Sequence, residues 1–180
     1  MSKRRVLGLI ASLVLALSLM VPLTACNNVR EQVANVRDSV LQAIQGDVSG
    51  DIGKEYQTKW FTFSILEISH ANTYAGLTPA SGNEFIVIKL TEKNTTSISQ
   101  VFGTFDWFVD APSFSDYVYP LDPSPSDSTM MPLRFDLKPN ESATYICVFE
   151  VPRNTQGLQL VYIELDDQDK VYGTFTIDIK

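Results

Sequence analysis

The sequence predicts an all-β protein, an antiparallel β-sandwich preceded by a signal peptide and a short N-terminal helix. After Glu55 the apolar residues recur with the period of two that is typical of strands, and turn-forming Gly, Pro and Asn separate the stretches. At least six such stretches follow at the spacing usual in sandwiches, with no convincing helical pattern among them. The 155 residues after residue 25 suit one domain with a good core plus a short extension.

Residues 1–25 are predicted to be a bacterial lipoprotein signal peptide. Three basic residues at 3–5 precede an uncharged apolar run at 6–23, and Leu23, Thr24 and Ala25 lead to Cys26. In this order the small residues fit a lipoprotein peptidase, and Cys26 takes a thioether-linked lipid, with palmitate as the expected fatty acid. An ordinary signal peptide and an uncleaved anchor stay open, because the run is about long enough to span a bilayer. The lipoprotein interpretation places the rest of the chain on the extracellular face of the cell membrane.

Residues 26–52 are expected to form a lipidated tether with a short helix and a linker. Apolar residues spaced by three and four over residues 29–44 predict a helix of about four turns, and Gly46 supplies a stop. This helix could be a partly ordered stalk, could pack on the domain or a partner, or could lie on the membrane surface. Residues 46–51 are typical of a flexible linker.

Residues 53–180 are expected to form the sandwich. The run at 84–92 is apolar on both faces, which predicts a central strand. The clearest alternation lies at 143–151, and strands at 158–165 and 171–179 follow, joined by a turn at 166–169. The side chains expected to share an inward face are Phe61, Phe63 and Ile65; Phe105, Trp107 and Val109; Ala143, Tyr145, Cys147, Phe149 and Val151; and Val171, Gly173, Phe175, Ile177 and Ile179.

Charge and cysteine content limit the partners and the chemistry. The signal peptide holds three of the 14 basic residues and none of the 21 acidic ones, so the mature chain has a net charge of −10. Such a surface repels phosphate backbones, and nucleic acid is therefore not expected as a partner. With Cys26 lipidated, Cys147 is the only remaining thiol, and no internal disulfide forms. Its apolar surroundings predict a buried strand cysteine, with a reactive or intermolecular thiol as the alternative.

Several stretches resemble a known family when they are taken in order. Residues 59–63 (Lys-Trp-Phe-Thr-Phe) open the domain, residues 74–79 lead into 82–88, and Lys93-Asn94-Thr95-Thr96 ends that strand. Residues 137–142 and Phe149-Glu150-Val151-Pro152 follow. Over residues 53–180 this order resembles the immunoglobulin-like, telokin-like extracellular domain of Gram-positive lipoproteins, a group of unknown function. The resemblance implies an immunoglobulin-like sandwich on a lipid tether and no catalytic residue. Asn140 stands where the family commonly has glycine, and asparagine also tolerates a left-handed turn.

No catalytic residue, cofactor or metal site is predicted. The chain has one histidine, His70, at the end of a strand with no nucleophile elbow near it. One histidine and one free cysteine make a zinc site of the usual kind implausible. Calcium is a weak alternative at two turns, because hard cations need several oxygen ligands. These turns hold Asp166, Asp167 and Asp169, and Asp122 and Asp127.

The segment 111–132 is the best candidate contact surface. It holds five of the nine prolines, so it cannot be a central strand. Long loops on sandwiches are common binding elements, and exposed tyrosine and methionine suit adaptable contacts. The candidate contacts are Tyr117, Tyr119, Met130 and Met131. The alternative is an ordinary crossover in which a tyrosine covers the edge of the core.

The sequence therefore favours a non-catalytic interaction module on a lipid tether, with a protein partner in the cell envelope. The alternative is a sensor or carrier domain that binds a cation or a small hydrophobic molecule. An enzyme is the third hypothesis, and no motif in the chain favours it.

Overall fold

The computed structural model describes residues 47–165 and 170–179. The predicted signal peptide, the lipidation site Cys26 and the predicted helix at 29–44 lie outside these residues, as do Asp166, Asp167 and Asp169. In the part that is described, no helix has both the length and the apolar character needed to cross a membrane. Almost all of the regular structure from residue 47 onward is β-strand.

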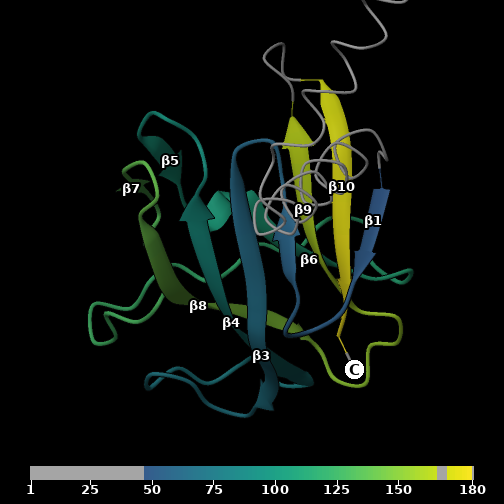
Figure 1. Ribbon diagram of the computed structural model, residues 1–180. Helices are drawn as coiled ribbons and strands as arrows, with labels where there is room; N and C mark the ends of the chain where they lie inside the picture. Colours follow the sequence, from purple (N-terminus) through teal and green to yellow (C-terminus); the bar gives the residue numbers. More distant parts are fainter. Residues whose placement is uncertain (1–46, 166–169, 180) are drawn as a thin grey trace, which may run out of the picture. The chain divides into compact units, whose positions relative to one another are not determined.

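Ten strands and one short 3-10 helix make up the described region. They are β1 (Asp47–Gly50), β2 (Glu55–Gln57), β3 (Phe61–Ala71), β4 (Asn83–Asn94), β5 (Gln100–Phe102), η1 (Thr104–Asp106), β6 (Trp107–Asp110), β7 (Phe135–Leu137), β8 (Ser142–Pro152), β9 (Gln159–Leu165) and β10 (Val171–Asp178). One sheet has the order β1-β10-β9-β6, a second has the order β2-β3-β4-β8, and β5 pairs with β7 (Figure 1). Every pair except β1–β10 is antiparallel, which confirms the predicted all-β antiparallel sandwich.

The long strand β4 is central in its sheet, as its two apolar faces predicted. It pairs with β3 from Phe85 to Asn94 and with β8 from Asn83 to Lys93. Phe85, Ile86 and Ile88 are all buried, so both faces of the strand are covered. A strand in this position needs apolar side chains on both sides, which is why the sequence pattern was clear here.

The other sheet begins earlier than expected. The sequence predicted a flexible linker over residues 46–51, and this prediction is wrong for residues 47–50, which form β1. This strand runs parallel to β10, with Asp47 opposite Thr174 and Gly50 opposite Ile177. Val48 is its only apolar side chain, so local sequence carries no strand pattern. Pairing with β10 therefore stabilises this strand, although the intrinsic β-propensity of its residues is low.

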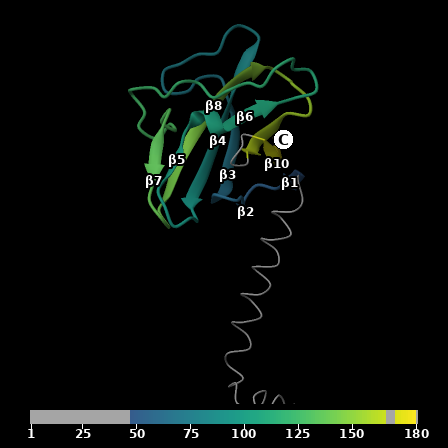
Figure 2. The ribbon, with the colours of Figure 1, turned by 90° about the horizontal axis from the view of Figure 1, so that it is seen from above.

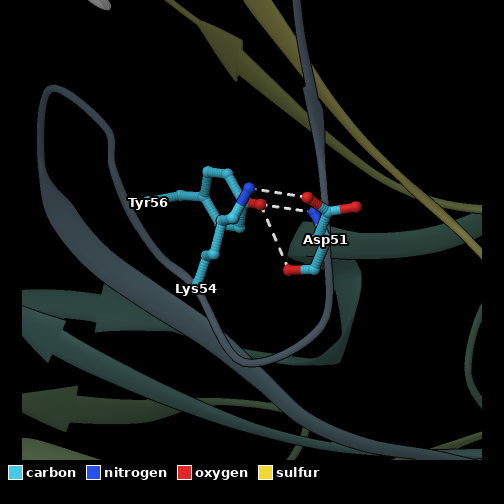
Figure 3. Close-up of polar contacts among 3 residues, drawn as sticks. All are labelled: Asp51, Lys54 and Tyr56. Atoms are coloured by element: carbon cyan, nitrogen blue, oxygen red, sulfur yellow. Dashed lines mark hydrogen bonds and ion pairs between the residues drawn. The ribbon is translucent and has the colours of Figure 1, made fainter.

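A polar network closes the turn between β1 and β2 (Figure 3). The Tyr56 hydroxyl donates a hydrogen bond to the Asp51 carbonyl oxygen at 3.1 Å and accepts one from the Asp51 N–H. Lys54 Nζ donates to Asp51 Oδ2 at 2.6 Å. The buried Tyr56 ring lies 5.3 Å from the ring of Phe63, so this turn is fixed to the core.

The core lies between the two four-stranded sheets, which form two layers in Figures 1 and 2. The inward face predicted for β8 is confirmed, since Cys147, Phe149 and Val151 are buried in this core. In the last strand the predicted face holds for Phe175 and Ile177 but not for Val171, which is exposed. A register shift between Val171 and Gly173 explains the difference, because one extra residue reverses the direction of the side chains that precede it.

The turn before β8 uses a left-handed residue where the sequence suggested one. Asn140 has a φ of 63°, in the region that asparagine tolerates better than most residues. Its N–H donates to the Asn94 carbonyl oxygen at 3.0 Å, and the Glu141 N–H donates to the Lys138 carbonyl oxygen at 3.0 Å. Asparagine in place of glycine at position 140 therefore still forms the turn.

Candidate functional site

The segment 111–132 crosses from one sheet to the other. At its start, Val118 exchanges two hydrogen bonds of 2.9 Å with Val109 on β6. Further on, the Leu121 N–H donates to the Val148 carbonyl oxygen, and the Met131 N–H donates to the Ile146 carbonyl oxygen, both on β8. The segment thus occupies backbone groups at the edge strands β6 and β8. This is the crossover that the sequence left open as the alternative.

The two methionines of the segment are core residues. Met130 is 3% exposed and packs with Phe85 and Val148 in a small cluster on the outer face of its sheet. Met131 is 1% exposed and belongs to the main core, where Cys147 Sγ lies 3.7 Å from its sulfur. The prediction that Met130 and Met131 form an exposed contact surface is therefore wrong. Backbone pairing to β8 turns the two neighbouring side chains to opposite sides, and both sides are covered.

The two tyrosines are exposed, as the contact-surface prediction requires. Tyr117 is 45% exposed and Tyr119 is 51% exposed. Their rings lie 4.2 and 6.0 Å from the ring of Phe108, a buried residue of β6. Because Phe108 follows the core residue Trp107 in the strand, it points to the outer face of the sheet, where the tyrosines cover it.

Phe105 adds a third exposed ring. It is 68% exposed, and its ring lies 6.5 Å from that of Tyr119. The sequence placed Phe105 inward, on one face with Trp107 and Val109, and this is wrong for Phe105. Residues 104–106 form η1 instead of a strand, so the alternation begins only at Trp107. We call Phe105, Tyr117 and Tyr119 the aromatic surface.

Acidic side chains border the aromatic surface. Asp110, Asp116 and Tyr117 line a hollow of about 330 Å³ together with Phe114 and Ser115. A groove of similar volume runs past Phe105 on the other side and includes Asp106, Leu133 and Arg134 among its lining residues. The rings are thus set among shallow depressions, not on a flat face.

The other residues that the sequence singled out have structural surroundings. His70 Nδ1 lies 3.2 Å from Glu84 Oε2 at the end of β3. Cys147 is buried, as predicted, and its burial raises the pKa of the thiol well above the usual range. Asp127 accepts hydrogen bonds from the Thr129 N–H and hydroxyl, which lower its pKa, and Oδ2 accepts from the Tyr74 hydroxyl. Over residues 47–165 and 170–179, no three His, Cys, Asp or Glu side chains gather closely enough to hold a metal ion.

A second feature, which the sequence did not indicate, is a pocket of about 190 Å³ between β5 and the first residues of β3. We call it the aromatic pocket. Aromatic side chains from β3, β5 and β9 form most of its wall, and the edge-to-face contacts of Phe61 with Phe102 and Tyr162, both at 5.1 Å, fix three of them. The lining residues are Trp60, Phe61, Gln100, Val101, Phe102, Asp106 and Tyr162.

Two buried carboxyl groups, Glu92 and Glu164, and the half-buried Asp106 lie in or near this pocket. Burial raises the pKa of Asp106, and the Gly103 N–H, which donates to Asp106 Oδ2 at 2.8 Å, partly offsets the effect. Burial also raises the pKa of Glu164, which accepts a hydrogen bond from the Lys59 N–H. Glu92 is fully buried, and its pKa is raised to about 8, mainly by desolvation.

Glu92 is the least satisfied of these groups. Its Oε1 accepts a hydrogen bond from Trp107 Nε1 at 2.8 Å. Its Oε2 is the one fully buried side-chain oxygen or nitrogen that lacks a partner within the described residues. A buried carboxyl of this kind favours the neutral form. No sequence pattern marked this buried carboxyl, because Glu92 stands at the polar end of the strand predicted over residues 84–92.

Comparison with known proteins defines the fold and leaves the family open. No family model and no curated protein matches the chain. It is similar to the solved structure of YjhA from Bacillus subtilis, with 12% identity, a TM-score of 0.53, and coverage of 72% of this chain and 98% of that one. It is also similar to YcdA, a candidate lipoprotein from Bacillus subtilis, with 18% identity and a TM-score of 0.54. That match covers 69% of this chain but only 38% of YcdA.

A third structure extends this likeness to another organism. MPT63, a secreted protein from Mycobacterium tuberculosis, has 8% identity and a TM-score of 0.55, over 75% of this chain and 99% of that one. The fold is an immunoglobulin-like β-sandwich. At these identities the likeness concerns the fold alone. The predicted place of the chain among telokin-like lipoproteins stays a prediction.

Proposed function

We propose that this protein is a lipid-anchored extracytoplasmic protein whose sandwich binds a protein partner in the cell envelope without catalysing a reaction. The order of basic residues, apolar run and Cys26 supports the anchor. The same order supports an extracellular position on the cell membrane, and the lipoprotein resemblance suggests a Gram-positive envelope.

The aromatic surface is the observation that carries the proposed binding role. Phe105, Tyr117 and Tyr119 are exposed together, and the two tyrosines rest on the buried ring of Phe108. Aromatic side chains held in place in this way lose little conformational freedom on binding, and they are enriched at the energetic centres of interfaces. A sandwich that needed only solubility would gain nothing from exposing them.

Charge indicates the chemistry of the partner. The mature chain has a net charge of −10, and Asp110 and Asp116 line the hollow beside Tyr117. A partner segment that combines apolar and basic side chains would match both the rings and the surrounding carboxylates. The same charge opposes binding to nucleic acid.

The groups available for catalysis support a binding role. The Nδ1 atom of His70 lies 3.2 Å from Glu84 Oε2. Triad-type chemistry would also need a nucleophile within hydrogen-bond reach of the His70 ring. The thiol of Cys147 is buried and its pKa is raised, so its reactive thiolate form is disfavoured.

The test is proximity crosslinking in membranes of the native host. The full-length protein is compared with the double variant Phe105→Ala/Tyr119→Ala and with the control Ile52→Ala/Leu66→Ala, which removes two exposed apolar side chains from other elements. We expect a specific partner that is captured by the wild type and the control and is lost with the double variant. Equal capture by all three would refute the surface as the binding site.

The anchor is tested separately. Cys26→Ala should leave an unprocessed precursor or release the protein from the membrane fraction, as measured by fractionation and lipid labelling. Unchanged lipid labelling would contradict the lipidation of Cys26.

A second candidate function, a sensor or carrier of a small ligand, is favoured by one observation. The aromatic pocket has an apolar wall with a few polar groups, which is the usual composition of small-molecule sites.

A further inference from the structure

The wall of the aromatic pocket is rigid and electron-rich. The ring of Phe61 makes edge-to-face contacts with the rings of Phe102 and Tyr162, and Trp60 completes the wall. Lys59 Nζ already lies 4.3 Å from the centre of the Trp60 ring, which shows that this ring attracts a cation. Lys59 does not itself line the pocket.

The polar groups of the pocket carry negative charge or unused hydrogen-bonding capacity. Within the described residues, Asp106 Oδ2 accepts from the Gly103 N–H and Oδ1 has no hydrogen-bond partner. Tyr162 is only 7% exposed, yet its hydroxyl makes no hydrogen bond to a described residue. Since this hydroxyl is not among the fully buried atoms that lack a partner, it is open to the pocket, and a ligand there can hydrogen-bond to it.

Among the described residues, the groups that act electrostatically on this phenol are acidic. Glu164, Asp106 and Glu92 all exert a coulombic effect on Tyr162. Arg134 lines the neighbouring groove but not the pocket. A bound anion would therefore meet like charge, whereas a bound cation would meet carboxylates and ring faces.

We propose that the aromatic pocket binds an organic cation, an alkylammonium or alkylguanidinium group, with Asp106 as the charged partner and Tyr162 as a hydrogen-bonding partner. The volume of about 190 Å³ has room for a head group with a short alkyl chain. The cation can come from a Lys or Arg side chain of a protein partner or from a free small molecule. This inference is independent of the aromatic surface as a binding site.

The test is a titration of the full-length protein in mild detergent with n-butylguanidinium. Trp60 lines the pocket, so tryptophan fluorescence reports on occupancy, and amide chemical shifts locate the site. The neutral n-butylurea and the anion pentanoate have similar size and serve as controls. We expect saturable binding of the guanidinium alone, with shifts at residues 100–106 and at Tyr162. Binding of n-butylurea with equal affinity would overturn the proposal, because the carboxylate would then have no role.

Variants identify the charged partner. Asp106→Asn keeps an oxygen for the Gly103 N–H and removes the charge, and we expect binding to weaken about tenfold or more. Glu67→Gln removes the same charge at an exposed position of β3, six residues from the pocket-lining Phe61, and should leave affinity within about twofold. Equal losses from both would refute a specific site.

A rim variant avoids changes to the buried wall. Val101 lines the pocket and is exposed, so Val101→Arg should fold normally and place a competing guanidinium at the mouth. We expect it to weaken binding of n-butylguanidinium at least about tenfold, and Val101→Gln to have little effect. Undiminished binding to the folded Val101→Arg protein would contradict the assignment.

The source of the cation is distinguished by repeating the crosslinking with saturating n-butylguanidinium. Loss of the captured partner would support the pocket as the receptor for a partner side chain. Unchanged capture, with the titration positive, would support a free small molecule as the ligand.

Discussion

Two groups of aromatic side chains lie on the two sides of β6 and differ in what covers them. The inner aromatic cluster consists of Phe61, Phe63, Trp107, Tyr162 and Phe175, all buried between the sheets. The aromatic surface, by contrast, is open to solvent although it rests on the same strand through Phe108. The sandwich would keep its core without Phe105, Tyr117 and Tyr119. Their exposure therefore needs an explanation in binding, whereas the inner cluster is explained by stability.

The largest loss of stability should come from a substitution of Phe63, in the inner aromatic cluster. Its ring lies 5.0 Å from Trp107 and 5.6 Å from Phe175, and it is almost fully buried. Phe63→Ala leaves a cavity that the surrounding rings cannot fill, and it should destabilise the domain by about 3–5 kcal/mol in denaturant unfolding. A loss below about 1 kcal/mol would mean that the inner cluster does not carry the stability of the fold.

Glu92 is the polar exception inside the inner cluster, and it should make stability depend on pH. Its pKa is about 8 in the folded protein against 4.5 for an ordinary glutamate, so between these values the folded state holds a proton that the unfolded state releases. Stability should therefore fall as pH rises through this window, by as much as about 1.4 kcal/mol for each pH unit. The raised pKa values of Asp106 and Glu164 change stability in the same direction.

Glu92→Gln removes this ionisation and keeps an oxygen for the Trp107 N–H. We expect the variant to lose much of the pH dependence and to be more stable than the wild type above pH 8, as measured by chemical denaturation across the window. A slope as steep as that of the wild type would show that other groups cause it.

Gly103 is the residue before η1, the turn that carries Phe105 and Asp106. Its φ of 179° is extended backbone that any residue adopts, so the constraint is one of space. A Cβ at this position would meet the backbone carbonyl of Leu133. Gly103→Ala should cost about 1–3 kcal/mol and displace Asp106 from the aromatic pocket, which thermal unfolding and the n-butylguanidinium titration measure. Normal stability with normal binding would show that the segments around Gly103 and Leu133 can move apart without loss of stability.

The parts of the fold that could be predicted are those in which one strand carries its own signal. β4 and β8 have clear apolar patterns because their neighbours bury them over long stretches. β1 has no such pattern, because it is stabilised by pairing in parallel with β10. The inward face of β10 was predicted except at Val171, where a bulge reverses the alternation. Pairing partners and bulges are tertiary features, and local propensity does not contain them.

The candidate site was predictable only in part for a related reason. Tyr117 and Tyr119 were found from the composition of their loop, and they are exposed. Met130 and Met131 shared that composition but are buried, because the loop pairs with β8 just there. The aromatic pocket joins residues from β3, β5, η1 and β9, which are far apart in sequence. No spacing pattern could have brought Asp106 and Tyr162 together.

The smallest effect on stability should come from the aromatic surface, and that is what separates it from the inner cluster. Phe105 contacts Tyr119, and Tyr119 also contacts Phe108, but both Phe105 and Tyr119 lie outside the core. Phe105→Ala/Tyr119→Ala should therefore change the free energy of unfolding by less than about 1 kcal/mol, as is usual for exposed positions. Capture of the partner should be lost in the same protein. If the variant instead lost stability like Phe63→Ala, the exposed rings would be part of the core's support, and their exposure would no longer argue for binding.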